Sequence, residues 1–124
     1  MKAIVADSEG CWRLVYAGVL KTAFPGIDIE EAASERELEE RVRKDYFSVV
    51  MCDDIQFDGL NVLRRLREVG NQRRSYIVFC LVGQESYRPA DNCFNFKHGE
   101  IYLTKKDLSQ DFDDLAARLS PYFH

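Results

Sequence analysis

Two hydrophobic periodicities alternate along the chain. Short apolar runs, which are typical of strands, are separated by segments whose apolar residues recur at helical spacing. Residues 46–52 and 76–82 are apolar nearly throughout, as in strands that are covered on both faces, whereas 27–32 alternates, as in a strand at a sheet edge. The predicted strands are residues 2–6, 27–32, 46–52, 76–82 and 100–103.

Three helices with recognisable ends are predicted between the first strands. The first covers residues 12–23, and Pro25 breaks the chain after it. Ser34 and Glu37 have the spacing of a capping box, which predicts the start of a second helix. Asp58 is the expected N-cap of a third helix.

The second half of the chain completes the alternation. The helical pattern weakens over residues 84–99, where Pro89 interrupts it, so we expect a short or distorted helix there. A last helix is predicted over 108–119, and Pro121 ends it. Five strands alternating with five helical segments predict one domain, residues 1–124, of the α/β class. The expected fold is a doubly wound, flavodoxin-like (βα)5 domain with a five-stranded parallel sheet of strand order 2-1-3-4-5.

Composition narrows the class of protein. Apolar residues make up 46% of the chain and charged residues 31%, which fits a soluble globular domain, and we expect a cytoplasmic protein. No apolar run is long enough for a membrane span, and the net charge of −4 argues against nucleic acid as a partner. The basic residues within 64–74 could bind an anion, but a solvated helix face and its loop is the favoured interpretation. The cysteines form no C-x-x-C pair and are expected to be reduced thiols; they are Cys11, Cys52, Cys80 and Cys93.

Charged residues stand where the apolar runs stop. Asp7 follows the first strand, Asp53 and Asp54 follow the third, and Lys105 and Lys106 follow the fifth. In the predicted strand order the ends of strands 1 and 3 are neighbours, so Asp7 and Asp53 should face each other. Two close carboxylates favour a hard divalent cation such as Mg²⁺ between them, and a nearby lysine would complement a bound anion.

Three sequence strings resemble the strand ends of a known family. The strings are IVADSE, FSVVMCDDIQFDGLNVLRRLRE and YLTKKDL, and they are similar in order and spacing to response-regulator receiver domains of two-component signalling. The resemblance covers nearly the whole chain. It implies that Asp53 is the phosphoacceptor, Lys105 the phosphoryl contact and Tyr102 the switch aromatic. It also implies Mg²⁺ as cofactor, held by Asp7, Asp53 and the backbone carbonyl of Ile55.

The resemblance implies a signalling role rather than that of an enzyme. Asp53 would take a phosphoryl group from a phosphohistidine or a small phosphodonor and form an acyl phosphate. The expected partners are a sensor histidine kinase or another signalling protein, with no membrane and no direct nucleic-acid contact. Whether the protein forms a homodimer is left open. The sequence ends soon after the fifth predicted helix, so we expect either a stand-alone receiver or one cut from a longer protein, with an output that runs through protein contacts.

The sequence departs from the family pattern in four places, and the first three of these departures favour an alternative. Ala6 replaces the first residue of the acidic pair, which weakens the expected magnesium site. Val82 stands where a Ser or Thr is expected, so a hydroxyl that would contact the phosphoryl group is missing. The loop over 53–59 is about two residues shorter than in the family, and Lys106 replaces a common proline. The alternative is a pseudo-receiver, a protein-interaction module that works without phosphorylation.

The site residues also have simpler structural interpretations. Asp7 and Asp53 have the position of helix caps, although Asp58 is the better cap for the third helix. Asp54 could replace the missing acid only if the loop turned it inward. Tyr102 could equally be a half-buried strand aromatic, and Lys105 a solvated lysine.

Three further hypotheses concern two other functions and the partner surface. A flavin or nucleotide carrier on the same fold would need a Gly- or Ser/Thr-rich phosphate loop, and ADSEG instead carries two acids there. A hydrolase would need a nucleophile motif that the chain lacks. Aromatic residues within 85–98, namely Tyr87, Phe94 and Phe96, are the candidate partner surface, unless they fill the core beside strand 4.

Overall fold

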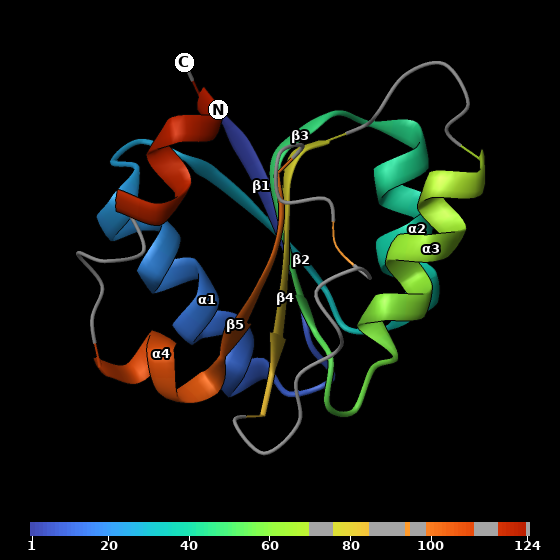
Figure 1. Cartoon of the computed structure of the whole chain (residues 1–124), viewed down its shortest axis with the longest axis horizontal. Helices are drawn as coiled ribbons and strands as arrows, with labels where there is room; N and C mark the ends of the chain where they lie inside the picture. The colour runs from blue at the N-terminus through green and yellow to red at the C-terminus, as the bar shows by residue number, and fades with distance from the viewer. Residues whose placement is uncertain (70–75, 85–93, 95–98, 111–116, 124) are drawn as a thin grey trace.

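The computed structural model describes residues 1–69, 76–84, 94, 99–110 and 117–123. Its centre is a parallel sheet of order β2-β1-β3-β4-β5, which confirms the predicted topology (Figure 1). Each strand lies within one residue of its predicted bounds. The strands are β1 (Lys2–Ala6), β2 (Asp28–Ala32), β3 (Phe47–Asp53), β4 (Tyr76–Gly83) and β5 (Glu100–Thr104).

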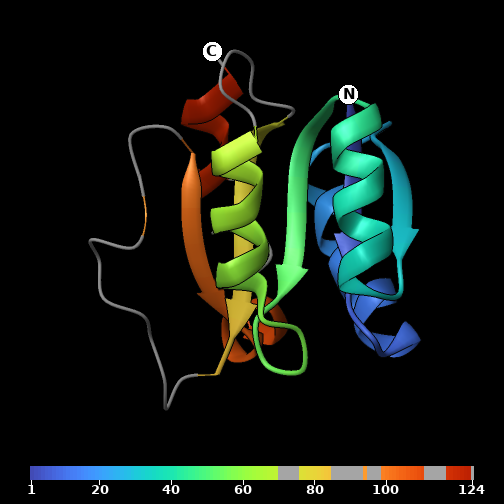
Figure 2. The same cartoon turned by 90° about the vertical axis from the view of Figure 1, so that its right-hand side faces the viewer.

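Helices cover both faces of the sheet. α1 (Gly10–Ala23) and α4 (Lys105–Gln110) lie on one face together with the short 3-10 helix η3 (Ser120–Phe123). α2 (Glu35–Lys44) and α3 (Gly59–Val69) lie side by side on the other face (Figure 2). Side chains that alternate along each strand therefore pack into two separate cores, one under each helix layer.

The caps of α2 and α3 follow the sequence signals. The Ser34 hydroxyl accepts a hydrogen bond from the Glu37 backbone N–H at 3.1 Å. The Glu37 carboxylate in turn accepts from the N–H of Ala33, one residue before the position that a standard capping box uses. Asp58 caps α3 as predicted, because its carboxylate accepts from the Asn61 N–H at 3.2 Å.

The start of the last helix differs from the prediction. The predicted helix began at residue 108, whereas α4 begins at Lys105, directly after β5. The cause is a reciprocal pair of hydrogen bonds, because the Asp107 N–H donates to the Thr104 hydroxyl and the Thr104 N–H donates to the Asp107 carboxylate. The Thr-x-x-Asp spacing is a capping signal that the apolar pattern concealed. Of the predicted helix, residues 111–116 lie outside the described part of the chain.

The aromatic segment before β5 is described only in part. Phe94 is buried, and its ring centroid lies 5.9 Å from that of Tyr102. Its assignment to an exposed partner surface is therefore wrong, because it fills the core instead. Tyr87 and Phe96 lie outside the described residues.

Two basic residues of α3, Arg65 and Arg67, are paired with acids. Arg65 forms ion pairs with Glu39 and Glu35 of α2. Arg67 pairs with Glu100, whose carboxylate is buried at the start of β5. These pairs support a solvated, neutralised face rather than an anion site.

Within the described residues, no helix is both long and apolar enough to cross a membrane.

Candidate functional site

The carboxyl ends of β1, β3 and β5 converge on one lysine. The register pairs Ala6 with Cys52, so the residues that follow them, Asp7 and Asp53, leave neighbouring strands side by side. The Lys105 ammonium nitrogen lies 3.4 Å from Asp7 Oδ2 and 3.5 Å from Asp53 Oδ1. Both carboxylates are fully buried. The structure therefore brings together the three residues that the sequence placed at separate strand ends.

Asp7 is held by the first turn and the inner face of α1. Its Oδ1 accepts a hydrogen bond from the Glu9 N–H at 2.9 Å. The N-cap of α1 is Glu9, so Asp7 lies before the helix and is not its cap. Asp7 Oδ2 accepts from the Tyr16 hydroxyl at 2.7 Å. The Arg13 guanidinium donates to the backbone carbonyl of Asp7 at 2.7 Å. Burial, together with the hydrogen bond to Asp7, raises the pKa of Tyr16 far above its ordinary range, so Tyr16 is a permanent donor.

Asp53 is wrapped by its own loop. Its Oδ1 accepts from the Ile55 N–H at 3.1 Å, and its Oδ2 accepts from the N–H groups of Gln56 at 2.8 Å and Phe57 at 3.0 Å. The loop can close this tightly because Gly59 packs against β3. A β-carbon on Gly59 would lie 2.6 Å from the Asp53 carbonyl oxygen. The shortened loop is thus a ring of backbone donors around the Asp53 carboxylate.

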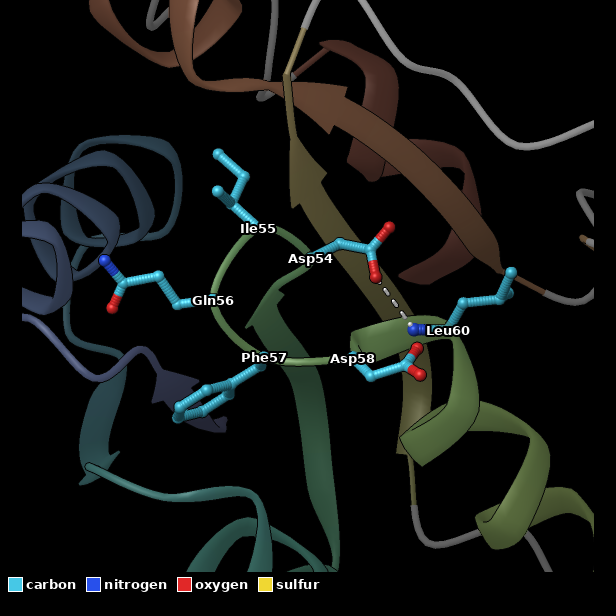
Figure 3. Close-up of a pocket in the computed structure, with 6 residues that line it drawn as sticks. All are labelled: Asp54, Ile55, Gln56, Phe57, Asp58 and Leu60. Atoms are coloured by element: carbon cyan, nitrogen blue, oxygen red, sulfur yellow. Dashed lines mark hydrogen bonds between the residues drawn. The ribbon is translucent and has the colours of Figure 1, made fainter.

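Asp54 faces away from this cluster. Figure 3 shows its carboxylate directed toward the start of α3, where Oδ1 accepts a hydrogen bond from the Leu60 N–H at 3.1 Å. Burial raises the pKa of Asp54, and the nearby charge of Asp58 adds to the increase. Asp54 therefore caps α3. It does not replace the acidic residue that was expected at the position of Ala6.

Trp12 covers the lysine from the side of α1. Its ring centroid lies 4.3 Å from the Lys105 ammonium nitrogen, which is a cation–π distance. The same ring lies 6.2 Å from the ring of Tyr16. Trp12 is the single tryptophan of the chain, so its fluorescence reports on this cluster alone.

Polar side chains join the two loops above the cluster. The Gln56 amide nitrogen donates to the Glu9 carboxylate at 3.2 Å. The Ser8 hydroxyl donates to the Gln56 amide oxygen. The loop after β1 and the loop after β3 are therefore tied together over the buried carboxylates.

The two expected switch positions lie on β4 and β5. Tyr102 is buried rather than half-buried, and its hydroxyl lies against the α-carbon side of Gly83. Val82 is also buried and has no side-chain donor; its backbone carbonyl accepts from the Asp54 N–H at 2.8 Å. The switch role of both residues stays a prediction.

The cluster has the chemistry of a site for a hard cation, but the carboxylate oxygens of Asp7 and Asp53 already accept hydrogen bonds. Two buried carboxylates face one ammonium, so the group keeps an excess negative charge and offers the oxygen ligands that Mg²⁺ prefers. Two carboxylates have about eight acceptor positions. The hydrogen bonds and ion pairs above fill most of them. Among the described residues no three His, Cys, Asp or Glu side chains gather into a ready metal cage.

Sequence reasoning missed three contributors to this site. Tyr16 and Trp12 fall within the helix predicted over residues 12–23, and Gln56 falls between the third predicted strand and the third helix. A buried tyrosine needs a partner for its hydroxyl, and Asp7 and Glu9 are the acids just before that helix, which was the available signal. Nothing in the sequence pointed to Gln56.

Comparison with known proteins gives a fold relationship. No protein-family model and no curated protein sequence matches the chain. It is similar to the response regulator protein TrrA from Thermotoga maritima in complex with Mg²⁺-BeF, with 21% identity, a TM-score of 0.72, and coverage of 98% of this chain and 97% of the other.

Two further solved structures show the same likeness. A receiver domain protein from Methanospirillum hungatei has 18% identity and a TM-score of 0.71, with 98% and 92% of the two chains covered. The receiver domain of a Francisella response regulator has 23% identity and a TM-score of 0.65, with 98% and 95% covered. The chain therefore has the fold of response-regulator receiver domains.

Proposed function

We propose that this chain, which has the receiver fold, is a two-component signalling module whose Asp53 accepts a phosphoryl group. The observation that carries the proposal is the lysine bridge: Lys105 contacts both Asp7 and Asp53 at the carboxyl edge of the sheet. One ammonium between two buried carboxylates is the arrangement that would neutralise charge as a phosphoryl group arrives. A structural neighbour, TrrA, was solved with Mg²⁺-BeF, which adds indirect support.

The reaction transfers a phosphoryl group and leaves the rest of the donor intact. An oxygen of Asp53 attacks phosphorus, a new O–P bond forms, and the bond from phosphorus to the donor nitrogen or oxygen breaks with its electron pair. Lys105 balances the charge on the phosphoryl oxygens, and the N–H groups of Ile55, Gln56 and Phe57 hold the carboxylate in place. Bound Mg²⁺, held by Asp7, Asp53 and the Ile55 carbonyl, would supply further charge neutralisation.

The signal would pass to other proteins rather than into chemistry on a substrate. The donor would be a sensor histidine kinase or another phosphorylated signalling protein. The acyl phosphate would change the contacts around Lys105 and Tyr102, which lie at and just before the junction of β5 and α4.

The test is intact-mass spectrometry after incubation with acetyl phosphate and magnesium. Wild type should gain one phosphoryl adduct, and Asp53→Asn should gain none. Asp54→Asn is the matched control, because its side chain caps α3 outside the cluster, and it should be modified like wild type. An adduct that survives in Asp53→Asn would refute the assignment of the phosphoacceptor.

A second candidate function has its own supporting observation. Asp53 is fully buried and accepts three backbone hydrogen bonds, and Val82 offers no hydroxyl to a phosphoryl group. These features favour a phosphorylation-independent interaction module. Wild-type protein that is folded by circular dichroism and takes no adduct would select this candidate.

A further inference from the structure

Tyr16 and Lys105 both donate to the same oxygen of Asp7, so a metal ion that binds this oxygen has to displace one of them. The Tyr16 hydroxyl lies 2.7 Å from Asp7 Oδ2, and Lys105 lies 3.4 Å from the same oxygen. A carboxylate oxygen accepts about two hydrogen bonds, so Oδ2 has no remaining acceptor position. The Tyr16 contact is the shorter of the two and is fully buried.

The other oxygen of Asp7 and both oxygens of Asp53 are engaged by backbone N–H groups. Those donors belong to the turns that follow β1 and β3, and a side-chain substitution does not remove them. Tyr16 and Lys105 are therefore the side-chain donors of the described cluster that compete with a cation. Lys105 also neutralises the pair, whereas the neutral hydroxyl of Tyr16 does not.

We propose that the Tyr16 hydroxyl is a built-in competitor that lowers the affinity of the Asp7–Asp53 pair for a divalent cation. The inference rests on the proposed function only in that it takes this pair as the metal-binding element. A cation at Asp7 Oδ2 must break a buried hydrogen bond to a charged acceptor before it binds. The protein thus keeps its carboxylate cluster satisfied at low metal concentration and requires more magnesium than an unobstructed pair would.

The test is a magnesium titration of wild type and Tyr16→Phe, followed by Trp12 fluorescence and repeated by isothermal titration calorimetry. Phenylalanine keeps the packed ring and removes only the hydroxyl. Trp12 lies against both Lys105 and Tyr16, so displacement of the ammonium changes its emission. Tyr46→Phe is the matched control, because Tyr46 is exposed and lies outside the cluster.

Tyr16→Phe should bind magnesium at least about tenfold more tightly than wild type, since a net hydrogen bond to a charged group is worth at least the ~1.4 kcal/mol that this ratio represents. Tyr46→Phe should match wild type. Equal affinities for wild type and Tyr16→Phe overturn the proposal, and so does an absence of binding to both at the highest soluble magnesium concentration. Tyr16→Met, which also removes the hydroxyl, repeats the comparison if Tyr16→Phe is poorly folded.

This result is separate from the phosphorylation test. Tighter magnesium binding by Tyr16→Phe in a protein that takes no phosphoryl adduct supports the competitor role and refutes the phosphoacceptor. An adduct on wild type with unchanged magnesium affinity in Tyr16→Phe does the reverse.

Discussion

The hydroxyl of Tyr102 lies where a β-carbon on residue 83 would stand, which is possible because residue 83 is a glycine. The two residues lie on neighbouring strands, and Tyr102 is buried as a result. The absence of a side chain at position 83 thus decides where the tyrosine ring lies.

Gly83→Ala should force Tyr102 out of its buried position. Overpacking of this kind costs about 1–3 kcal/mol in free energy of unfolding, which urea denaturation measures. Gly18→Ala is the control, because a β-carbon there meets no atom within 4 Å and lies in the middle of α1. It should stabilise the protein by up to about 1 kcal/mol. A Gly83→Ala protein as stable as wild type would show that Tyr102 is not held by this contact.

Lys105→Met should destabilise the protein more than a surface substitution does. It removes the cation from two fully buried carboxylates, and an uncompensated buried charge costs about 3 kcal/mol or more. Lys106→Met, at the exposed neighbouring position, should change the free energy of unfolding by about 0.5 kcal/mol or less. Denaturation followed by circular dichroism separates the two. Equal losses would mean that Lys105 does not neutralise the cluster.

The stability of the protein should fall in alkaline solution through Cys80. Burial raises the pKa of the Cys80 thiol from 9.0 to about 12. Below pH 9 the thiol is protonated in both states; above it the unfolded chain ionises while the folded protein does not, so unfolding becomes easier as the pH rises.

Between about pH 8 and pH 10, wild type should therefore lose about 1.4 kcal/mol more stability than Cys80→Ala, which lacks the thiol. Urea denaturation of both proteins at the two pH values measures the difference. If the two proteins have the same pH dependence, Cys80 ionises equally in both states and the explanation is wrong.

The sheet could be predicted because its signals are local and repeated. Val49, Val50 and Met51 are apolar on both sides of β3, and the alternation over β2 marks an edge strand, so the order of strands followed from the general topology of such sheets. The start of α4 was missed because Lys105, Lys106 and Asp107 are polar, whereas the helix there depends on hydrogen bonds between Thr104 and Asp107.

The site could be predicted only where residues stand at strand ends. Asp7, Asp53 and Lys105 were located from their positions alone. Tyr16 was not, because its role depends on the distance between the inner face of α1 and the end of β1, which apolar periodicity does not encode. The same holds for Gln56, whose contacts depend on the path of a short loop.

The start of β1 and the short helix η3 both lie at the end of the sheet opposite to the Asp53 loop, as Figure 1 shows. η3 packs against β4 on the α1 face, and every strand runs toward the other end of the sheet. A linker to a sensor chip, a fluorescent protein or a solid support at either end would therefore point away from Asp7, Asp53 and Lys105. The protein can be immobilised at either end with the loops that cover its carboxylate cluster facing away from the support.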